Sequence, residues 1–224
     1  MINRTKLIII RHGQSIGNAT NRILGHTDMD LTELGYKQAN ATAEHLKNEI
    51  IDKIYSSDLK RAFNTAIPHG KLHNLDVFTS KDLRELYIGE WENLFVNEII
   101  ERWGREVYEN QWFGNFGTFK FPSGEAVSEG GMRFYNVLVR ISKDNPGKTV
   151  LISAHAAVIR AFWGYISGIS WSELADKLPF PTNASYSIAY FDGEKIIPDK
   201  YSCDEHLVDV GITKVKMINK SNYN

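Results

Sequence analysis

A short, unbroken apolar run near the start of the chain limits the folds available to it. Leu7 is followed by three consecutive isoleucines, a pattern typical of a strand buried on both faces in a parallel sheet. A second run of this kind occupies residues 149–153, and a histidine and then helical sequence follow each run. Because such sheets carry helices on both faces, we expect an α/β fold, a three-layer α/β/α sandwich with a mostly parallel central sheet.

The sequence between the two runs alternates between helix and strand patterns. Thr32 precedes apolar residues at helical spacing that end at Leu46, which predicts a capped amphipathic helix of about four turns. A brief strand is expected at 54–55, and the cluster Ser56-Ser57-Asp58 is expected to cap a helix over 59–71 that weakens at Pro68. The other expected elements are helices over 123–142 and 157–167 and an edge hairpin made of strands 186–191 and 195–197.

Length and charge narrow the class of protein. The 224 residues have near-average composition, which suits a single folded domain over 1–224. With 26 basic and 27 acidic residues, the chain has no overall attraction to nucleic acid or to a membrane surface. It lacks an apolar stretch that resembles a signal peptide or a membrane span, and Cys203 is its only cysteine. We therefore expect a cytoplasmic protein with frayed residues 219–224, and the oligomeric state stays open.

An aromatic-rich stretch interrupts the alternation of helices and strands. Nine aromatic residues lie between Trp91 and Phe121, and we interpret about 93–121 as an inserted cap. Gly114 and Gly117 predict that the second half of this cap is loop. Most of its rings are expected to pack the cap onto the sheet. The alternative is that one or two rings, from Trp112 or Phe116, face a bound molecule.

Several polar residues stand where a ligand site is expected in an open α/β sheet, beyond the carboxyl ends of the strands. Arg11 and His12 follow the first buried run, and His155 follows the second. Asn18, Arg61 and His155 would all meet His12 at one crevice if the two strands are neighbours in the sheet. Guanidinium groups match phosphate oxygens, and an imidazole nitrogen that is unprotonated near neutral pH is a competent nucleophile. This set predicts a phosphate site and a phosphohistidine intermediate.

Five blocks of sequence reinforce this interpretation. In chain order they are LIIIRHGQSIGN at 7–18, GHTDMDLT at 25–32, YSSDLKRA at 55–62, LRELYIGEWE at 83–92 and LISAHAAVIRA at 151–161. They resemble, in the same order, the RHGxSxxN, GxxDxxLT, SSxLxRA, LxExxxGxWE and second-histidine motifs of the histidine phosphatase superfamily, also called the phosphoglycerate mutase-like family. The blocks extend over most of the chain, so the resemblance bears on both the fold and the site.

The resemblance implies a role for each matching residue. His12 is the implied nucleophile, and Glu85 is the implied acid that protonates the leaving oxygen and then takes a proton from water. The implied catalytic residues are His12, Glu85, Arg11, Arg61 and His155, and the implied substrate-binding residues are Arg11, Asn18, Gly25, Arg61, His155 and Ala156. Ala156 stands where the family usually has glycine, and Arg160 is expected to be a structural partner on its helix. No metal and no other cofactor is implied.

The expected function is a metal-independent phosphomonoester hydrolase acting on a small phosphorylated metabolite. One alternative is a cofactor-dependent phosphoglycerate mutase. Such mutases typically have Thr-Gly where this chain has Leu24-Gly25, Arg-His-Tyr-Gly where it has residues 86–89, and a basic insertion where it has the aromatic stretch, which favours the hydrolase. The other alternative is a non-catalytic phosphate-binding module, which the presence of both histidines and Glu85 disfavours. The alcohol that is released stays open.

Overall fold

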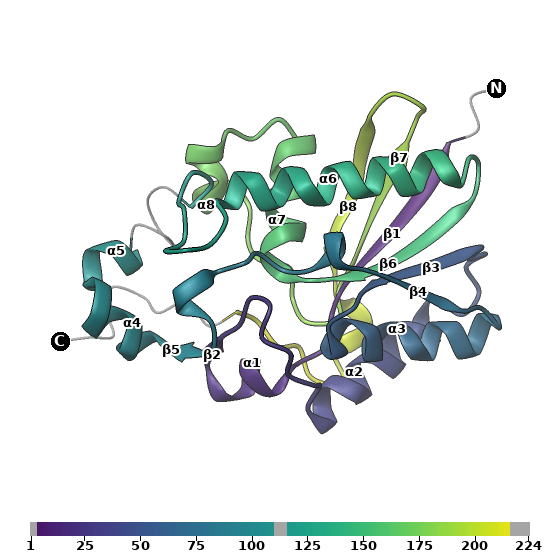
Figure 1. Cartoon of the computed structure of the whole chain (residues 1–224). Helices are drawn as coiled ribbons and strands as arrows, with labels where there is room; N and C mark the ends of the chain where they lie inside the picture. Colours follow the sequence, from purple (N-terminus) through teal and green to yellow (C-terminus); the bar gives the residue numbers. More distant parts are fainter. Residues whose placement is uncertain (1–3, 110–115, 216–224) are drawn as a thin grey trace.

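A central six-stranded sheet organises the protein (Figure 1). The computed structural model describes residues 4–109 and 116–215. The strand order is β4-β3-β6-β1-β7-β8, in which the first four strands are parallel to one another and β7 and β8 form an antiparallel edge. The strands are β1 (Thr5–Arg11), β3 (Lys53–Ser57), β4 (Val77–Ser80), β6 (Thr149–Ala154), β7 (Tyr186–Phe191) and β8 (Ile196–Cys203). The predicted mostly parallel α/β sheet and its edge hairpin are confirmed.

Helices cover both faces of this sheet. Figure 1 shows α6 (Val127–Asp144) and α7 (Ala156–Ile166) on one side, and α2 (Glu33–His45) and α3 (Lys60–His73) on the other. Leu7 and Ile9 of β1 belong to the core on the side of α6 and α7, whereas Ile8 and Ile10 belong to the core under α2 and α3. Alternate side chains of a strand point to opposite faces. The unbroken apolar run therefore supplies both halves of the core.

Two helices differ from their predicted starts or ends. Helix α6 begins at Val127 because a turn with Ser123 at φ 55° precedes it. Helix α3 continues past Pro68 to His73. The sequence had predicted a cap from the cluster Ser56-Ser57-Asp58. The carboxylate of Asp58 does not cap the helix, because it pairs with Arg84. The N–H of Lys60 donates instead to the carboxylate of Asp28, at 2.8 Å. A side chain 32 residues away thus replaces the local cap.

Most of the remaining elements lie beyond the end of the sheet to which the carboxyl ends of the parallel strands point (Figure 1), whereas the short helix at 205–207 packs against α2. The remaining elements are α1 (Ile16–Thr20), β2 (Arg22–Ile23), β5 (Leu94–Phe95), α4 (Val96–Trp103), α5 (Arg105–Glu109), α8 (Leu174–Lys177) and the short helices η1 (Lys81–Leu83), η2 (Gly89–Trp91), η4 (Trp171–Glu173) and η5 (Glu205–Leu207). Trp91 is fully buried among the rings of Trp103, Tyr108, Phe119 and Phe121. These rings pack on one another, and they belong to the hydrophobic core that includes Leu7 and Ile9 of β1.

Some expectations fall on residues 1–3, 110–115 and 216–224, which lie outside the described residues. They concern Trp112, the loop at Gly114 and the end of the chain at 219–224. The single domain and the cap boundaries at about 93–121 stay predictions. Within residues 4–109 and 116–215, none of the helices combines the length and the apolar character that a bilayer crossing requires.

Helix α3 buries His69 without a hydrogen-bond partner for either ring nitrogen among the described residues. Burial, followed by repulsion from His73 and His206, lowers the pKa of His69 to about 3. In the unfolded chain the pKa of His69 is about 6.5. Between pH 6.5 and 3, the unfolded chain therefore binds a proton at His69 that the folded protein does not bind. This contribution is absent above pH 6.5 and destabilises the protein progressively as the pH falls from about 6.5 towards 3.

We expect the variant His69→Leu to lose less stability on acidification than the wild type. Between neutral pH and pH 3, the unfolding free energy of the wild type should fall by roughly 4 kcal/mol more than that of the variant. Urea unfolding at a series of pH values measures it, and His45→Gln, at an exposed position of α2, controls for the loss of an imidazole. Parallel pH profiles for wild type and His69→Leu would contradict the assignment.

Candidate active site

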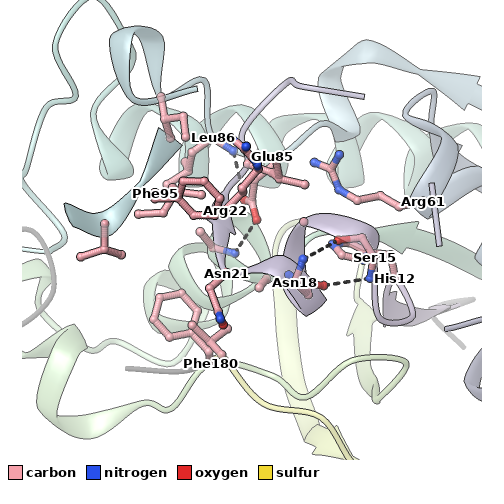
Figure 2. A pocket seen from close by; sticks show the side chains of 18 of the residues that line it. His12, Ser15, Asn18, Asn21, Arg22, Arg61, Glu85, Leu86, Phe95 and Phe180 are labelled. Carbon is pink, nitrogen blue, oxygen red and sulfur yellow. Dashed lines mark hydrogen bonds between the residues drawn. The ribbon is translucent and has the colours of Figure 1, made fainter. Parts of the chain in front are cut away.

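A cavity of about 450 Å³ opens where β1 ends (Figure 2). Six of the residues predicted from the sequence line it: Arg11, His12, Asn18, Arg61, Glu85 and Ala156. His155 and Gly25 are not among the lining residues, although the ring of His155 lies 5.2 Å from that of His12, centroid to centroid. This proximity follows from the parallel pairing of β1 with β6, which sets Arg11 opposite Ala154 and brings both histidines to the same sheet edge.

His12 is held in one orientation and one tautomer. Its Nδ1 lies 2.7 Å from the carbonyl oxygen of Gly13, and because a carbonyl only accepts, Nδ1 carries the proton and Nε2 keeps its lone pair. Its own carbonyl accepts from Asn183 Nδ2 at 3.1 Å. Burial, and then the positive charges of Arg61 and Arg11, hold the pKa of His12 well below its usual value. The ring is therefore neutral at physiological pH, with one nitrogen available to attack an electrophile.

Two buried guanidinium groups flank this imidazole. Arg11 donates from Nη1 to the carbonyl of Pro181 at 2.7 Å, and Arg61 donates to the carbonyls of Thr27 at 2.8 Å and Gly25 at 2.7 Å. Burial lowers the pKa of each arginine to about 10, so both stay charged at neutral pH. Neither forms an ion pair with a carboxylate of the described residues. Buried charge of this kind requires compensation, and a bound anion would supply it.

Gly25 contributes from behind the cavity. Its carbonyl and that of Thr27 hold Arg61, and the carboxylate of Glu92 accepts the N–H groups of His26 and Thr27, both at 2.7 Å. A Cβ at Gly25 would lie 2.2 Å from Glu92 Oε1, so a larger residue would displace this support. Gly25 therefore supports Arg61, and its predicted part in substrate binding stays a prediction.

Asn18 presents a donor to the cavity. Its Oδ1 accepts from the N–H of Ser15 at 3.1 Å and from Asn183 Nδ2 at 3.0 Å. These two bonds determine the orientation of the amide, because only its oxygen accepts. The NH₂ group of Asn18, whose residue lines the cavity together with His12 (Figure 2), is thereby left to bind an anion.

Glu85 lies at the N-terminus of α7 and is 8% exposed. Its carboxylate accepts the N–H groups of Ala157 at 3.1 Å and Val158 at 3.0 Å, which are among the helix donors without a partner inside the helix. Its backbone carbonyl accepts from Arg133 at 3.1 Å and from His26 Nε2 at 2.9 Å. Main chain and side chain are therefore both anchored, and Figure 2 shows the carboxyl group on the cavity wall.

His155 is fully buried, and neither of its ring nitrogens has a partner among the described residues. Burial, and then the charge of Arg61, keep the pKa of His155 well below its usual value. Buried polar groups without partners are rare in folded proteins and call for a physical reason. A phosphoryl oxygen bound between the two histidines would give this imidazole an acceptor for its N–H.

Phe116, one of the two rings that the sequence offered as facing a bound molecule, lines the cavity, but the other residues of its wall were not predicted from the sequence. Arg22 lies over the ring of Phe95, with Cζ 4.0 Å from the ring centroid, and donates to the carbonyl of Asn93 at 2.6 Å. Phe180 and Lys214 line the cavity from the far end of the chain. No spacing pattern links these residues, although Arg22 and Phe95 each lie three residues from a recognised block. Among the described residues, no three His, Cys, Asp or Glu side chains gather in a way that would hold a metal ion.

A neutral imidazole with a free nitrogen, two unpaired guanidinium groups and an anchored carboxylate form a site suited to phosphoryl transfer. Comparison with known proteins agrees. The family model described as histidine phosphatase superfamily (branch 1) matches residues 7–204. The chain belongs to this superfamily and is an enzyme of the phosphatase class.

Several similar proteins carry phosphatase names. Phosphoserine phosphatase 1 of Hydrogenobacter thermophilus is 30% identical, over 95% of this chain and 99% of its own length. The metal-independent phosphoserine phosphatase of Arabidopsis thaliana is 35% identical, over 92% and 85%. A probable phosphoglycerate mutase of Yersinia pestis is 30% identical, over 73% and 75%. Among solved structures, a phosphoserine phosphatase of Entamoeba histolytica in complex with 3-phosphoglyceric acid has a TM-score of 0.79 at 26% identity, covering 91% of this chain and all of the other.

Proposed function

We propose that this protein hydrolyses small phosphomonoesters through a phosphohistidine formed on Nε2 of His12. The observation that carries the proposal is the bond from His12 Nδ1 to the Gly13 carbonyl, which leaves Nε2 unprotonated beside Arg11 and Arg61. A neutral nucleophile between two unneutralised cations favours attack on a dianionic phosphate ester.

The first step transfers the phosphoryl group to the enzyme. Nε2 of His12 forms a bond to phosphorus while the bond from phosphorus to the substrate oxygen breaks. Arg11, Arg61 and the amide of Asn18 bind the equatorial oxygens, and His155 donates a further hydrogen bond. Glu85, entering in its protonated form, gives its proton to the leaving oxygen, so that the alcohol departs neutral.

The second step returns the enzyme to its starting state. Glu85, now a carboxylate, takes a proton from a water molecule as its oxygen attacks phosphorus, and the bond from phosphorus to Nε2 breaks. Inorganic phosphate leaves, His12 regains its lone pair and Glu85 holds the proton again. The same carboxyl group thus serves as acid and then as base.

The part of the cavity wall away from the phosphate site is where the leaving group of the substrate would lie. Its aromatic residues are Phe95, Tyr108, Phe116, Phe121 and Phe180. Arg22 and Lys214 are the cations that line this part, and they suit a carboxylate. The relatives named phosphoserine phosphatase and the neighbour bound to 3-phosphoglyceric acid support a small phosphorylated acid. We therefore propose a small phosphorylated metabolite whose apolar part packs on these rings.

The proposal extends to the organisation of the chain. Residues 1–224 form one catalytic domain with an inserted cap at about 93–121, because Tyr108, Phe116 and Phe121 of this stretch line the same cavity as His12. We also propose a cytoplasmic location, which the unpaired Cys203 supports.

A panel of phosphomonoesters tests the function. We expect the purified chain to release inorganic phosphate from phosphoserine, 3-phosphoglycerate and an aryl phosphate, with unequal kcat/KM values and with no change on adding a chelator. A parallel reaction contains 3-phosphoglycerate together with 2,3-bisphosphoglycerate. Formation of 2-phosphoglycerate there would identify a mutase, and binding of phosphate without turnover of any ester would identify a binding module.

A further inference from the structure

Arg160 of α7 is a buried cation outside the phosphate site. Its side chain is 1% exposed and forms no ion pair within residues 4–109 and 116–215. It donates from Nε to the carbonyl of Leu178 at 2.6 Å, and from Nη2 to those of Leu174 at 3.0 Å and Ala175 at 2.9 Å. These carbonyls belong to α8 and the residue that ends it, where a cation is favoured.

The same guanidinium packs against two aromatic rings. Its Cζ lies 4.6 Å from the ring centroid of Phe116 and 4.2 Å from that of Phe180. The two rings are 5.5 Å apart and nearly perpendicular, so the three groups form a closed triangle. Both phenylalanines line the catalytic cavity, and Figure 2 shows Phe180 at its wall. Burial lowers the pKa of Arg160 to about 10, which leaves the cation charged for interaction with both rings.

We propose that Arg160 is a positioning residue for the leaving group. It holds Phe116 and Phe180 as one wall of the cavity and thereby determines how strongly the site binds substrates whose leaving group carries a ring. Arg160 itself does not touch the substrate. The inference rests on the proposed function in one respect, the placement of the leaving group against these rings.

We expect a substitution at Arg160 to leave the phosphate-binding residues in place. Phe180 is followed by Pro181, whose carbonyl holds Arg11. The next residue, Thr182, is anchored independently, because its N–H donates to Ser202 Oγ at 3.1 Å and its Oγ1 donates to a carboxylate oxygen of Asp204 at 2.9 Å. A change at Arg160 should therefore move the aromatic wall and leave Arg11 in place.

Phosphonates that the enzyme cannot hydrolyse test the inference by calorimetry. For Arg160→Met, we expect the affinity for phenylphosphonate to fall about tenfold, because Phe116 and Phe180 are no longer held in the orientation that receives its ring. The affinities for methylphosphonate and inorganic phosphate should change less than about twofold, since Arg11 and Arg61 are unaffected. A loss shared equally by all three ligands, or no loss at all, would overturn the proposal.

Arg160→Lys separates positioning from stability. Lysine keeps the charge but lacks the planar fork that meets two rings and several carbonyls at once. We expect this variant to recover much of the thermal stability lost in Arg160→Met while its phenylphosphonate affinity stays low. Recovery of both properties together would mean that Arg160 only stabilises the fold. If Arg160→Met does not fold, Arg160→Lys carries the test.

Phe180→Ala provides a second line of evidence, because Phe180 is only partly buried. If Arg160 acts through this ring, the losses of phenylphosphonate affinity in Phe180→Ala and Arg160→Lys should not add in the double variant. Additive losses would contradict the mechanism.

The test also distinguishes this inference from the proposed function. A wild type that discriminates the two phosphonates but hydrolyses no ester would refute the function alone. A wild type that hydrolyses esters but binds both phosphonates equally would refute the role of the wall alone.

Discussion

Replacing His12 by alanine is expected to lower kcat for every phosphomonoester by at least about 10⁴-fold, because no phosphohistidine can form. Water would have to attack the ester directly, because the imidazole nitrogen that attacks phosphorus in the wild type is absent. Phosphate release measured over long incubations gives the residual rate. His45→Gln, an exposed histidine outside the cavity, is the matched control and should retain full activity.

The intermediate itself offers an independent measurement. Wild-type enzyme quenched during turnover of a ³²P-labelled ester should carry an acid-labile, alkali-stable label, as a phosphoramidate bond requires, and His12→Ala should carry none. Binding of inorganic phosphate should persist in the variant because Arg11 and Arg61 are held by backbone carbonyls. Substantial hydrolysis by His12→Ala, or a label that survives the substitution, would contradict the proposed chemistry.

The sequence was most informative where structure is determined locally. The apolar run 7–10 predicted a strand buried on both faces, and its side chains indeed divide between two cores. The two strand ends followed by histidine left one condition open, that the two strands are neighbours, and the parallel pairing of β1 with β6 meets it. In each case the evidence lies in neighbouring residues, whose alternation and β-branching respond to burial directly.

Contacts between distant segments were beyond such reasoning. The cap of α3 comes from Asp28 rather than from the adjacent Asp58, since only the folded chain reveals which carboxylate lies nearer. The glycines at 13 and 35 illustrate the same limit, because a Cβ at Gly13 would lie 2.4 Å from the carbonyl oxygen of Gly35. A Cβ at Gly35 would in turn lie 2.1 Å from the carbonyl oxygen of Gln14, so each position requires glycine for its own close contact.

The site was predicted in the same uneven way. The residues that follow strand ends could be anticipated from the sheet, whereas the N–H groups of α7 that hold Glu85 could not, because that contact joins residues 72 and 73 positions apart. Phe180 and Lys214 reach the cavity from the C-terminal part of the chain. The phosphate site therefore follows from motifs, while the leaving-group wall depends on the packing of separate segments.

Glu85→Gln is expected to slow the two chemical steps unequally. General acid–base catalysis of this kind contributes roughly 10²- to 10⁴-fold, so hydrolysis of an alkyl ester such as phosphoserine should fall by about that factor. An aryl phosphate with an acidic phenol as its leaving group needs no proton in the first step. Transfer of its phosphoryl group to His12 should therefore stay fast. Attack by water on the phosphohistidine loses its base with both the alkyl and the aryl ester.

Glu85→Gln should therefore give a burst of one phenol per active site with the aryl ester, followed by slow turnover, and the phosphorylated enzyme should accumulate. Stopped-flow absorbance measures the burst, and quenched labelling measures the phosphoenzyme. Glutamine keeps the size of the side chain and an acceptor for the N–H of Val158, although the N–H of Ala157 loses its acceptor, so we expect the local structure to change at that one contact. Glu90→Gln, an exposed carboxylate that accepts from Ser123, is the matched control and should behave as wild type. Equal losses of activity for alkyl and aryl esters, without a burst, would show that Glu85 is not the proton carrier. If Glu85 carries the proton, its removal cannot slow the transfer from the aryl ester to His12, because that step needs neither an acid nor a base.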